Sequence, residues 1–353
     1  MNNEKEKKNF NITATNEKDF FEQLKGRGIN GLQNLGNTCY VNTTLQCLGH
    51  TTSFLTHILC QKWKTDDKDR FHDEFYLIYK ALWVNNKSVI PMRFIKSISK
   101  YVNAWEVNWQ SDMHEFIIFC IDSLNREICT QLPKYEKNLG IKPNTYDLLQ
   151  HKADVHWNNM IGKEYSSLIP IFYGQIINQI VCKKCDSIYH NYEPFSALML
   201  PISDNGSLPL SLNDCIINYF KAENLNENSK NWKCDKCKTY EPCLKTLKFW
   251  RLPKTLIICL KRFDMMGNNK NNKKIDFPTT LDLSDNMIGP EEKKYDLVSV
   301  ANHYGQLMGG HYNAYTKDPN NNWYLHDDLS IEKCKSVKDV ITQNAYVLFY
   351  NEK

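Results

Sequence analysis

Cys39 lies in a stretch whose residue types suit a nucleophilic thiol. Residues 31–40 read Gly-Leu-Gln-Asn-Leu-Gly-Asn-Thr-Cys-Tyr and lead into an apolar helical pattern from Val41. A loop that delivers a cysteine to the first turn of a helix places its sulfur near free amide N–H groups and the positive end of the helix dipole, which favours thiolate. Asn34 has a side-chain amide that can donate to a developing oxyanion. The segment predicts a catalytic cysteine; the alternative is a buried structural cysteine at a helix start.

His311 and Asp327 have the types and spacing of a general base and the acid that orients it. His311 follows the glycine pair Gly309–Gly310, and Asp327 comes sixteen residues later in Trp-Tyr-Leu-His-Asp-Asp. If the residues after His311 and before Asp327 form a hairpin, the carboxylate can fix the imidazole tautomer and leave the other nitrogen facing Cys39. A lone histidine among ten is more often an ordinary surface or core residue, but this pattern predicts a base.

Four cysteines have the spacing of a metal site. Two Cys-x-x-Cys pairs stand far apart along the chain, Cys182 with Cys185 and Cys234 with Cys237. In a reducing compartment two such knuckles are typical ligands of a tetrahedral zinc ion. Four thiolates leave no open position for water, so the predicted zinc is structural and the chemistry needs no cofactor. The alternatives are a redox-active pair, for which the usual βαβ context is missing, or two unrelated thiol pairs.

A further polar segment precedes an apolar helical stripe. It contains Gln110, Asp112, His114 and Glu115, with Ser111 or Asp112 as a candidate N-cap. The two carboxylates lie at neighbouring helix positions and can meet a basic peptide. A plain solvated helix face is the alternative.

The elements that must position these residues indicate an α+β protein. Helical spacing of apolar residues begins at Val41 and recurs from Met113 to Leu124, so the first half is expected to be mainly helical. Beyond Pro170, short runs rich in branched and aromatic residues alternate with Gly, Pro, Asn and Asp, as strands and turns do. The sequence Asp-Pro-Asn-Asn-Asn from Asp318 is the expected turn of the histidine hairpin.

Composition argues against two classes of function, including a zinc-dependent nucleic-acid binder as a distant alternative. The 353 residues are 42% hydrophobic and 24% charged, and the net charge of +4 is too small for the basic face of a nucleic-acid binder. No apolar run suits a signal peptide or a membrane span, so we expect a cytoplasmic or nuclear protein whose 13 cysteines stay reduced. Abundant Asn, Lys and Ile indicates an AT-rich genome, and for a viral source the compartment is the host cell's. Residues 1–27 are expected to be a charged, flexible extension that is either disordered or loosely helical.

Taken together, these motifs resemble the ubiquitin-specific protease family of cysteine deubiquitinases. The similarity covers residue 28 to the C-terminus, with the motifs in the family's order. It is carried by the cysteine box Gly31–Leu48, the helix segment Gln110–Phe116, the Leu-Lys-Arg-Phe strand end at Phe263, and the histidine box over Tyr295–Tyr315 and Trp323–Asp328. His326 departs from the pattern, because an aromatic or aliphatic residue is common there.

The resemblance implies one catalytic domain over 28–353 with a papain-like cysteine protease fold. It implies a helical thumb over about 28–165, zinc-tipped β fingers over about 166–260 and a β-rich palm over about 261–353. It also implies that Asn34 completes the oxyanion hole and that Asp328 assists it. The tail of ubiquitin, which ends Leu-Arg-Gly-Gly, is expected to meet this set: Gln110, Asp112, His114, Glu115, Gly309 and Gly310.

The expected function is hydrolysis of the peptide or isopeptide bond after the C-terminal glycine of ubiquitin, through a thioester on Cys39. Two alternatives stay open: a non-catalytic ubiquitin-binding scaffold with a misaligned triad, and a protease for another modifier that ends Gly-Gly. The expected partners are ubiquitin and ubiquitinated proteins, and an activating subunit is left open. Neither nucleic acid nor a membrane is an expected partner.

Overall fold

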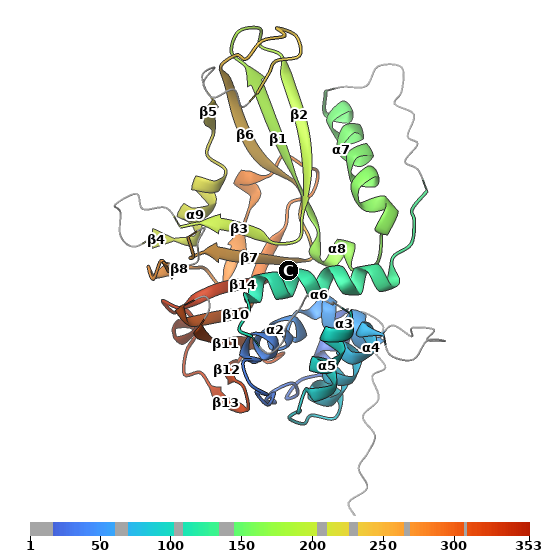
Figure 1. The fold of residues 1–353 in the computed structure, drawn as a ribbon, viewed down its shortest axis with the longest axis vertical. Helices are drawn as coiled ribbons and strands as arrows, with labels where there is room; N and C mark the ends of the chain where they lie inside the picture. Colours follow the sequence, from blue (N-terminus) through green and yellow to red (C-terminus); the bar gives the residue numbers. More distant parts are fainter. Residues whose placement is uncertain are drawn as a thin grey trace, which may run out of the picture. The chain divides into compact units, whose positions relative to one another are not determined.

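The chain folds into two compact units in the computed structural model, which describes residues 17–60, 70–101, 109–133, 145–202, 210–225, 232–264, 269–306 and 309–353. The first unit contains the residues up to Ile117 together with Val298–Val340; the second contains Ile118–Leu297 with Ile341–Lys353. Helix α6 (Met113–Ile128) and strand β10 (Lys294–Gln306) each run from one unit into the other along the chain. Figure 1 labels the elements. No helix among these residues is long and apolar enough to cross a bilayer.

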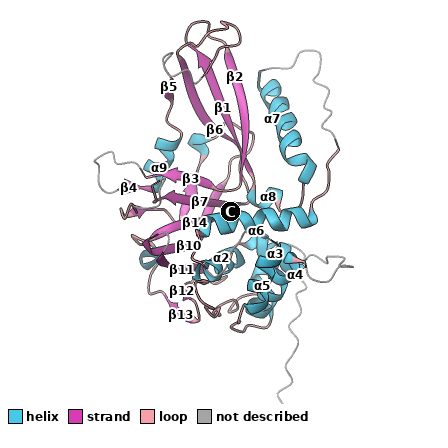
Figure 2. Cartoon of the chain, in the orientation of Figure 1, coloured by secondary structure: helices cyan, strands magenta, loops and turns pink. Residues whose placement is uncertain are grey.

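Helices make up most of the first unit's N-terminal part, as Figure 2 shows by colour. Helix α2 is buried along its whole length, so its packing stabilises it more than its helix propensity does. Aromatic rings from Phe54, Phe71, Phe75 and Phe94 meet mostly edge to face in the core between neighbouring helices. The helices are α1 (Glu17–Gln23), α2 (Cys39–Gly49), α3 (Thr52–Cys60), α4 (Phe71–Tyr79), a π-helical turn (Lys80–Val84) and α5 (Met92–Tyr101).

Helix α1 lies within residues 1–27 and is the helical form that the sequence left open for this segment. Phe20 and Leu24 are fully buried, and the Ser53 hydroxyl donates to the Glu17 carboxylate at 2.8 Å. Two apolar side chains spaced i and i+4 thus anchor this otherwise charged turn. Residues 1–16 lie outside the described residues.

Four antiparallel strands form the C-terminal part of the first unit. They are β10, β11 (Gly309–Lys317), β12 (Trp323–Asp327) and β13 (Ser330–Lys333), and a short 3-10 helix follows at Val337–Val340. The β11–β12 turn is closed by Asp318, whose carboxylate accepts from the backbone N–H groups of Asn320 and Asn322 at 2.9 and 2.8 Å. The predicted histidine hairpin is thus confirmed. Helix α2 packs on β11 and β12.

Strands dominate the second unit. One antiparallel sheet has the order β2 (Ile188–Phe195), β1 (Gly174–Cys182), β6 (Cys243–Arg251), β5 (Glu223–Leu225). Helix α7 (Thr145–Ile161) packs beside β2 (Figure 1), and Ala153, Ile177, Tyr192 and Trp250 form the buried cluster there. Strand β7 (Thr255–Lys261) pairs with β3 (Leu198–Pro201) and β14 (Ala345–Glu352). The remaining elements are α8 (Ile169–Phe172), α9 (Leu212–Tyr219), β4 (Leu210–Ser211), β8 (Ile275–Asp276), β9 (Thr280–Asp282) and 3-10 turns at Gly162–Glu164 and Ser284–Asn286. The α+β prediction is confirmed.

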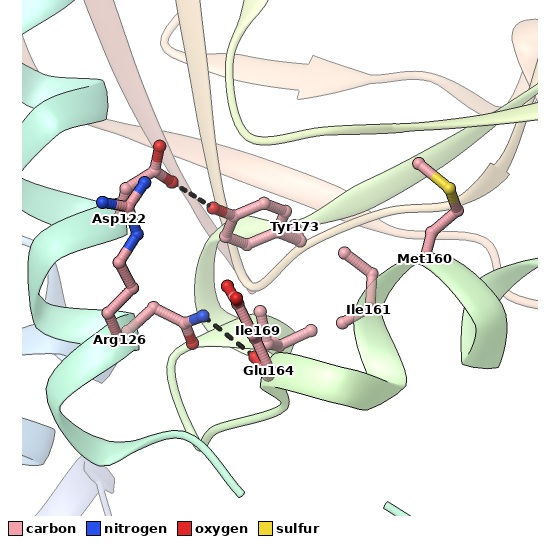
Figure 3. Close-up of a pocket in the computed structure, with 8 residues that line it drawn as sticks. Asp122, Arg126, Met160, Ile161, Glu164, Ile169 and Tyr173 are labelled. Atoms are coloured by element: carbon pink, nitrogen blue, oxygen red, sulfur yellow. Dashed lines mark hydrogen bonds between the residues drawn. The ribbon is translucent and has the colours of Figure 1, made fainter. Parts of the chain in front are cut away.

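A small pocket in the second unit lies where the C-terminal part of α6 meets the segment that leads into β1 (Figure 3). The Tyr173 hydroxyl donates to Asp122 at 2.6 Å, and the Asn125 amide donates to the backbone oxygen of Glu164 at 2.9 Å. These bonds tie the helix to the strand entrance, and no predicted site residue lies here.

Candidate active site and metal centre

Cys39 is the first residue of α2 and is 3% exposed. The loop before it turns through two left-handed residues, Gly36 (φ 94) and Asn37 (φ 53). The side-chain oxygen of Asn34 accepts from the N–H groups of Gly36 and Thr38 at 2.9 and 3.3 Å, which holds this loop against the helix start. The predicted placement of the cysteine at a helix N-terminus, where negative charge is favoured, is confirmed.

His311 on β11 joins the cysteine to Asp327 at the end of β12. Its Nε2 lies 2.6 Å from Asp327 Oδ1. Because Nε2 is bonded to the carboxylate, Nδ1 is the nitrogen left to exchange a proton with the thiol. Interaction with the Cys39 side chain, helped by Asp327 and opposed by burial, raises the pKa of His311 to about 9. The imidazolium form therefore persists at neutral pH.

His311, Asp327 and Asp328 lie close enough to resemble a metal-binding group. However, His311 Nε2 and Asp327 Oδ1 are only 2.6 Å apart, which is the length of a direct hydrogen bond. A metal ion bound to both atoms would need a bond of about 2.0 Å to each, so it would push them farther apart. The arrangement suits proton transfer better than metal binding.

Asn34 and Asp328, the two residues expected at the oxyanion hole, are in contact. Asn34 Nδ2 donates to Asp328 Oδ2 at 2.9 Å, and the Leu32 N–H donates to the backbone oxygen of Asp328 at 2.9 Å. A Cβ on Gly31 would lie 2.6 Å from the Leu329 Cα, so only glycine allows this close approach. The second amide hydrogen of Asn34 has no partner among the described residues and can donate to an oxyanion.

Asn42 is a residue that the sequence analysis missed. It is 2% exposed on α2, and its Nδ2 donates to Asp328 Oδ1 at 2.8 Å and to the Leu32 oxygen at 3.2 Å. Its spacing of i+3 from Cys39 places it on the same helix face. That spacing is the only signal in the sequence, because nothing local reveals what the amide will meet.

Gln110 has an internal partner. Its Nε2 donates to the Gly310 oxygen at 2.7 Å, and its Oε1 accepts from the Gly310 N–H, so the side chain pairs like a neighbouring strand. A Cβ on Gly310 would lie 2.3 Å from His303 Nε2, whereas one on Gly309 would have no atom of the described residues within 4 Å. Internal packing therefore explains why residue 310 is a glycine, whereas Gly309 borders open space.

Asp112, His114 and Glu115 lie at the start of α6. Asp112 Oδ1 accepts from the N–H groups of His114 and Glu115 at 2.7 and 3.4 Å, which confirms Asp112 as the N-cap. Burial lowers the pKa of His114, while Glu115 is exposed. Their contact with a substrate stays a prediction.

The four predicted metal ligands come together in the second unit. Each pair forms the same knuckle: the Asp186 N–H donates to the Cys182 oxygen at 2.9 Å, and the Lys238 N–H to the Cys234 oxygen at 2.7 Å. Asp186 and Lys238 both have positive φ, 54 and 61. One knuckle follows β1 and the other precedes β6, which pairs with β1.

The sulfur positions fit a tetrahedral ion. All four Sγ atoms lie within 4.8 Å of one another, with 3.7 Å between Cys185 and Cys234 and 4.0 Å between Cys182 and Cys237. A tetrahedron with metal–sulfur bonds of about 2.3 Å has edges of ~3.8 Å. The cluster can therefore hold one metal ion.

Known proteins share this sequence pattern. Residues 30–350 match the family model described as ubiquitin carboxyl-terminal hydrolase. The chain is 31% identical over 91% of its length to ubiquitin carboxyl-terminal hydrolase 4 of Saccharomyces cerevisiae, of which the match covers 39%. It is 30% identical over 94% of its length to ubiquitin carboxyl-terminal hydrolase 2 of Bos taurus, of which 56% is covered. The chain thus spans about half or less of these relatives.

Solved structures share the fold. A yeast SAGA DUB module containing Sgf73 has a chain that matches 94% of this one with a TM-score of 0.73 and 25% identity, and 70% of that chain is covered. A module of Ubp8, Sgf11, Sus1 and Sgf73 bound to monoubiquitin matches 93% of this chain with a TM-score of 0.72 and 24% identity, again over 70% of the matched chain.

Proposed function

Because the chain belongs to the ubiquitin carboxyl-terminal hydrolase family, we propose that it is a cysteine deubiquitinase. The observation that carries the proposal is the 2.6 Å hydrogen bond between His311 and Asp327, together with the interaction of Cys39 with that imidazole, which raises its pKa. A thiol at a helix N-terminus, an imidazole and a carboxylate in this order form a thiol hydrolase triad. The proposed substrate is the bond after the C-terminal glycine of ubiquitin, in line with the names of the relatives.

In the proposed reaction the thiolate of Cys39 attacks the carbonyl carbon of that glycine. The tetrahedral intermediate collapses as the His311 imidazolium donates its Nδ1 proton to the departing lysine amine, which leaves a thioester. Water then attacks the thioester while His311 accepts its proton, and the thiolate leaves. Asp327 holds Nε2 in place throughout. The raised pKa of His311, about 9, provides the proton that the amine needs at neutral pH.

We assign oxyanion stabilisation to Asn34. One of its amide hydrogens is bonded to Asp328, which fixes the amide plane and leaves the other hydrogen for the oxyanion. Asp328 acts by holding that amide, since a carboxylate cannot itself donate to an oxyanion.

The proposed tail site uses the same segment that the sequence indicated, with altered roles. Glu115 is exposed and suits the charge-assisted recognition of arginine. Asp112 caps the helix, and Gln110 holds Gly310 in place. Gly309, beside open space, is the better candidate for direct passage of a Gly-Gly tail.

A non-catalytic scaffold is the first alternative. The bond of 2.6 Å between His311 and Asp327 argues against it, because a misaligned triad would separate the base from its orienting carboxylate. The second alternative, a protease for another Gly-Gly modifier, keeps the same chemistry. Parallel assays with ubiquitin and ubiquitin-like substrates of the same leaving group separate the two modifiers.

A ubiquitin carrying a C-terminal propargyl group tests the proposal. Wild type should form a covalent adduct, and Cys39→Ala should form none. Cys60→Ala, which removes an exposed thiol outside the site, is the matched control and should label like wild type. Labelling of Cys39→Ala would remove Cys39 from its role, and absence of labelling and of ubiquitin-AMC turnover in wild type would remove the function.

We propose that the four-cysteine cluster holds zinc and that the protein works in a reducing compartment, the cytoplasm or nucleus, in line with its odd number of cysteines, which cannot all form disulfides with one another. Zinc would stabilise the sheet of β1 and β6 and would take no part in the reaction. The Ubp8 relatives occur in modules with other subunits. Assay of the isolated chain decides whether this one needs an activating subunit.

A further inference from the structure

Asn42 occupies a polar position in an otherwise tightly packed helix. It is 2% exposed and lies on α2 three residues after Cys39. Its amide nitrogen donates to Asp328 Oδ1 at 2.8 Å and to the Leu32 oxygen at 3.2 Å. A buried asparagine costs free energy unless its donors are used, so both contacts have structural weight.

Asp328 is held from three directions. Asn42 donates to one carboxylate oxygen, Asn34 donates to the other at 2.9 Å, and the Leu32 N–H binds the backbone oxygen. Asp328 also has a positive φ of 53, a conformation that a non-glycine residue keeps only when its surroundings enforce it. The carboxylate is therefore a bridge between the asparagine of the cysteine loop and the asparagine of the cysteine helix.

The bridge connects Asn42 to the oxyanion. The side-chain oxygen of Asn34 accepts hydrogen bonds from the N–H groups of Gly36 and Thr38. Its side-chain nitrogen donates to Asp328, so the amide is fixed at both ends. If Asp328 loses its bond from α2, its carboxylate can rotate, and the Asn34 donor is then held at one end only. We propose that Asn42 is a positioning residue that acts through Asp328 to aim the Asn34 donor at the developing oxyanion. This inference rests on the proposed deubiquitinase function.

A merely structural role for Asn42 predicts different behaviour. If the residue only fills space or ties α2 to Leu32, any variant that folds should lose activity by the same factor at every pH. If it acts through Asp328, a replacement that turns donor into acceptor should be pH-sensitive. Asn42→Asp places two carboxylates about 2.8 Å apart, and such a pair shares a proton at low pH. The shared proton would restore a hydrogen bond to Asp328.

The experiment measures ubiquitin-AMC turnover from pH 5.5 to 8.0 for three variants: Asn42→Ala, Asn42→Asp, and Asn42→Asp combined with Asp328→Asn. At pH 7.5 each single variant should lower kcat by about 10-fold or more, while KM changes by less than ~2-fold. Removal of one oxyanion donor lowers kcat by ~10²–10³-fold in enzymes of this kind. Relative to wild type, the kcat of Asn42→Asp should recover as pH falls, and the kcat of Asn42→Ala should not.

The double variant exchanges the hydrogen-bond donor and acceptor between positions 42 and 328. Its kcat at pH 7.5 should therefore exceed that of Asn42→Asp. Thr44→Val, which removes a buried hydroxyl that bonds the Tyr40 oxygen on the same helix, is the matched control and should keep wild-type kcat.

Melting temperatures of the same variants test the bridge without using activity. Asn42→Asp should melt lower than wild type at pH 7.5, and Asp328→Asn should restore part of the loss when added to it. A flat pH ratio for Asn42→Asp, or a double variant no better in turnover or melting than the single one, overturns the inference. An inactive wild type removes the proposed function instead, and the melting cycle then still decides whether Asn42 and Asp328 are coupled.

Discussion

The candidate triad in the first unit and the cysteine cluster in the second are assembled in opposite ways. The triad takes its side chains from α2, β11 and β12, and a hydrogen bond joins His311 to Asp327. The cluster takes two pairs from two local knuckles, each shaped by its own backbone bonds and a positive φ. Four thiols in contact have little attraction for one another until a metal ion joins them. The geometry of the triad thus depends on tertiary packing, whereas the geometry of the cysteine cluster depends on two short local motifs and on the metal ion that joins them.

Asp327→Asn should give the largest effect, because it replaces the carboxylate that orients the His311 imidazole. We expect kcat for ubiquitin-AMC to fall by about 10²- to 10⁴-fold, as loss of the orienting carboxylate does in related triads, with little change in melting temperature. Asp339→Asn, at a carboxylate that caps a surface turn, is the control and should keep full turnover. Near-normal turnover in Asp327→Asn would show that Asp328 or another group orients the imidazole.

Cys234→Ser should weaken metal binding by the cysteine cluster in the second unit and leave the triad in the first unit unchanged. Metal analysis should find about one zinc per wild-type chain and clearly less in the variant. The melting temperature should fall by roughly 5–10 °C, since the metal contributes folding energy. Cys129→Ser, in the same unit but outside the cluster, should change neither quantity. A metal-free wild type with the same melting temperature would exclude a structural zinc.

Gly310→Ala sharpens the comparison, because it tests packing next to the catalytic histidine. The added Cβ would lie 2.3 Å from both His303 Nε2 and the Tyr304 oxygen, so the strand must shift. We expect a loss of about 1–3 kcal/mol in the free energy of unfolding. Gly309→Ala, whose Cβ meets nothing, is the matched control and should unfold like wild type. Equal effects of the two would mean that the β10–β11 hairpin is looser than it appears.

The smallest effect concerns the charge of His311. Its folded-state pKa of about 9 exceeds the ordinary 6.5, so the stability it contributes is fully present below about pH 6.5 and is lost as pH rises through 9. The free energy of unfolding should therefore fall between those values. In Cys39→Ala the largest cause of the raised pKa is absent, so NMR titration should place the pKa of His311 closer to 6.5 than to 9. An unchanged titration would show that Asp327 alone sets it.

Much of the fold follows from local pattern. The buried helix after Cys39, the stripe from Met113, the strands beyond Pro170 and the Asp318 turn all appear where spacing and turn chemistry predict them. The family prediction is confirmed by the match over residues 30–350. The burial of Phe20 and Leu24 on α1 could not be predicted from the sequence, because the segment around them is charged and does not show which surface they will meet. The division into thumb, fingers and palm stays a prediction.

The sequence by itself determined which groups can do chemistry and which neighbours share a turn. Residues three or four apart in a helix or knuckle are within a few ångströms whatever the rest of the chain does. Only the tertiary structure decided that Asn42 meets Asp328 and that Gln110 pairs with Gly310. Those partners are remote along the chain, and the packing of α2 and the hairpins, rather than any local rule, brings them within bonding distance.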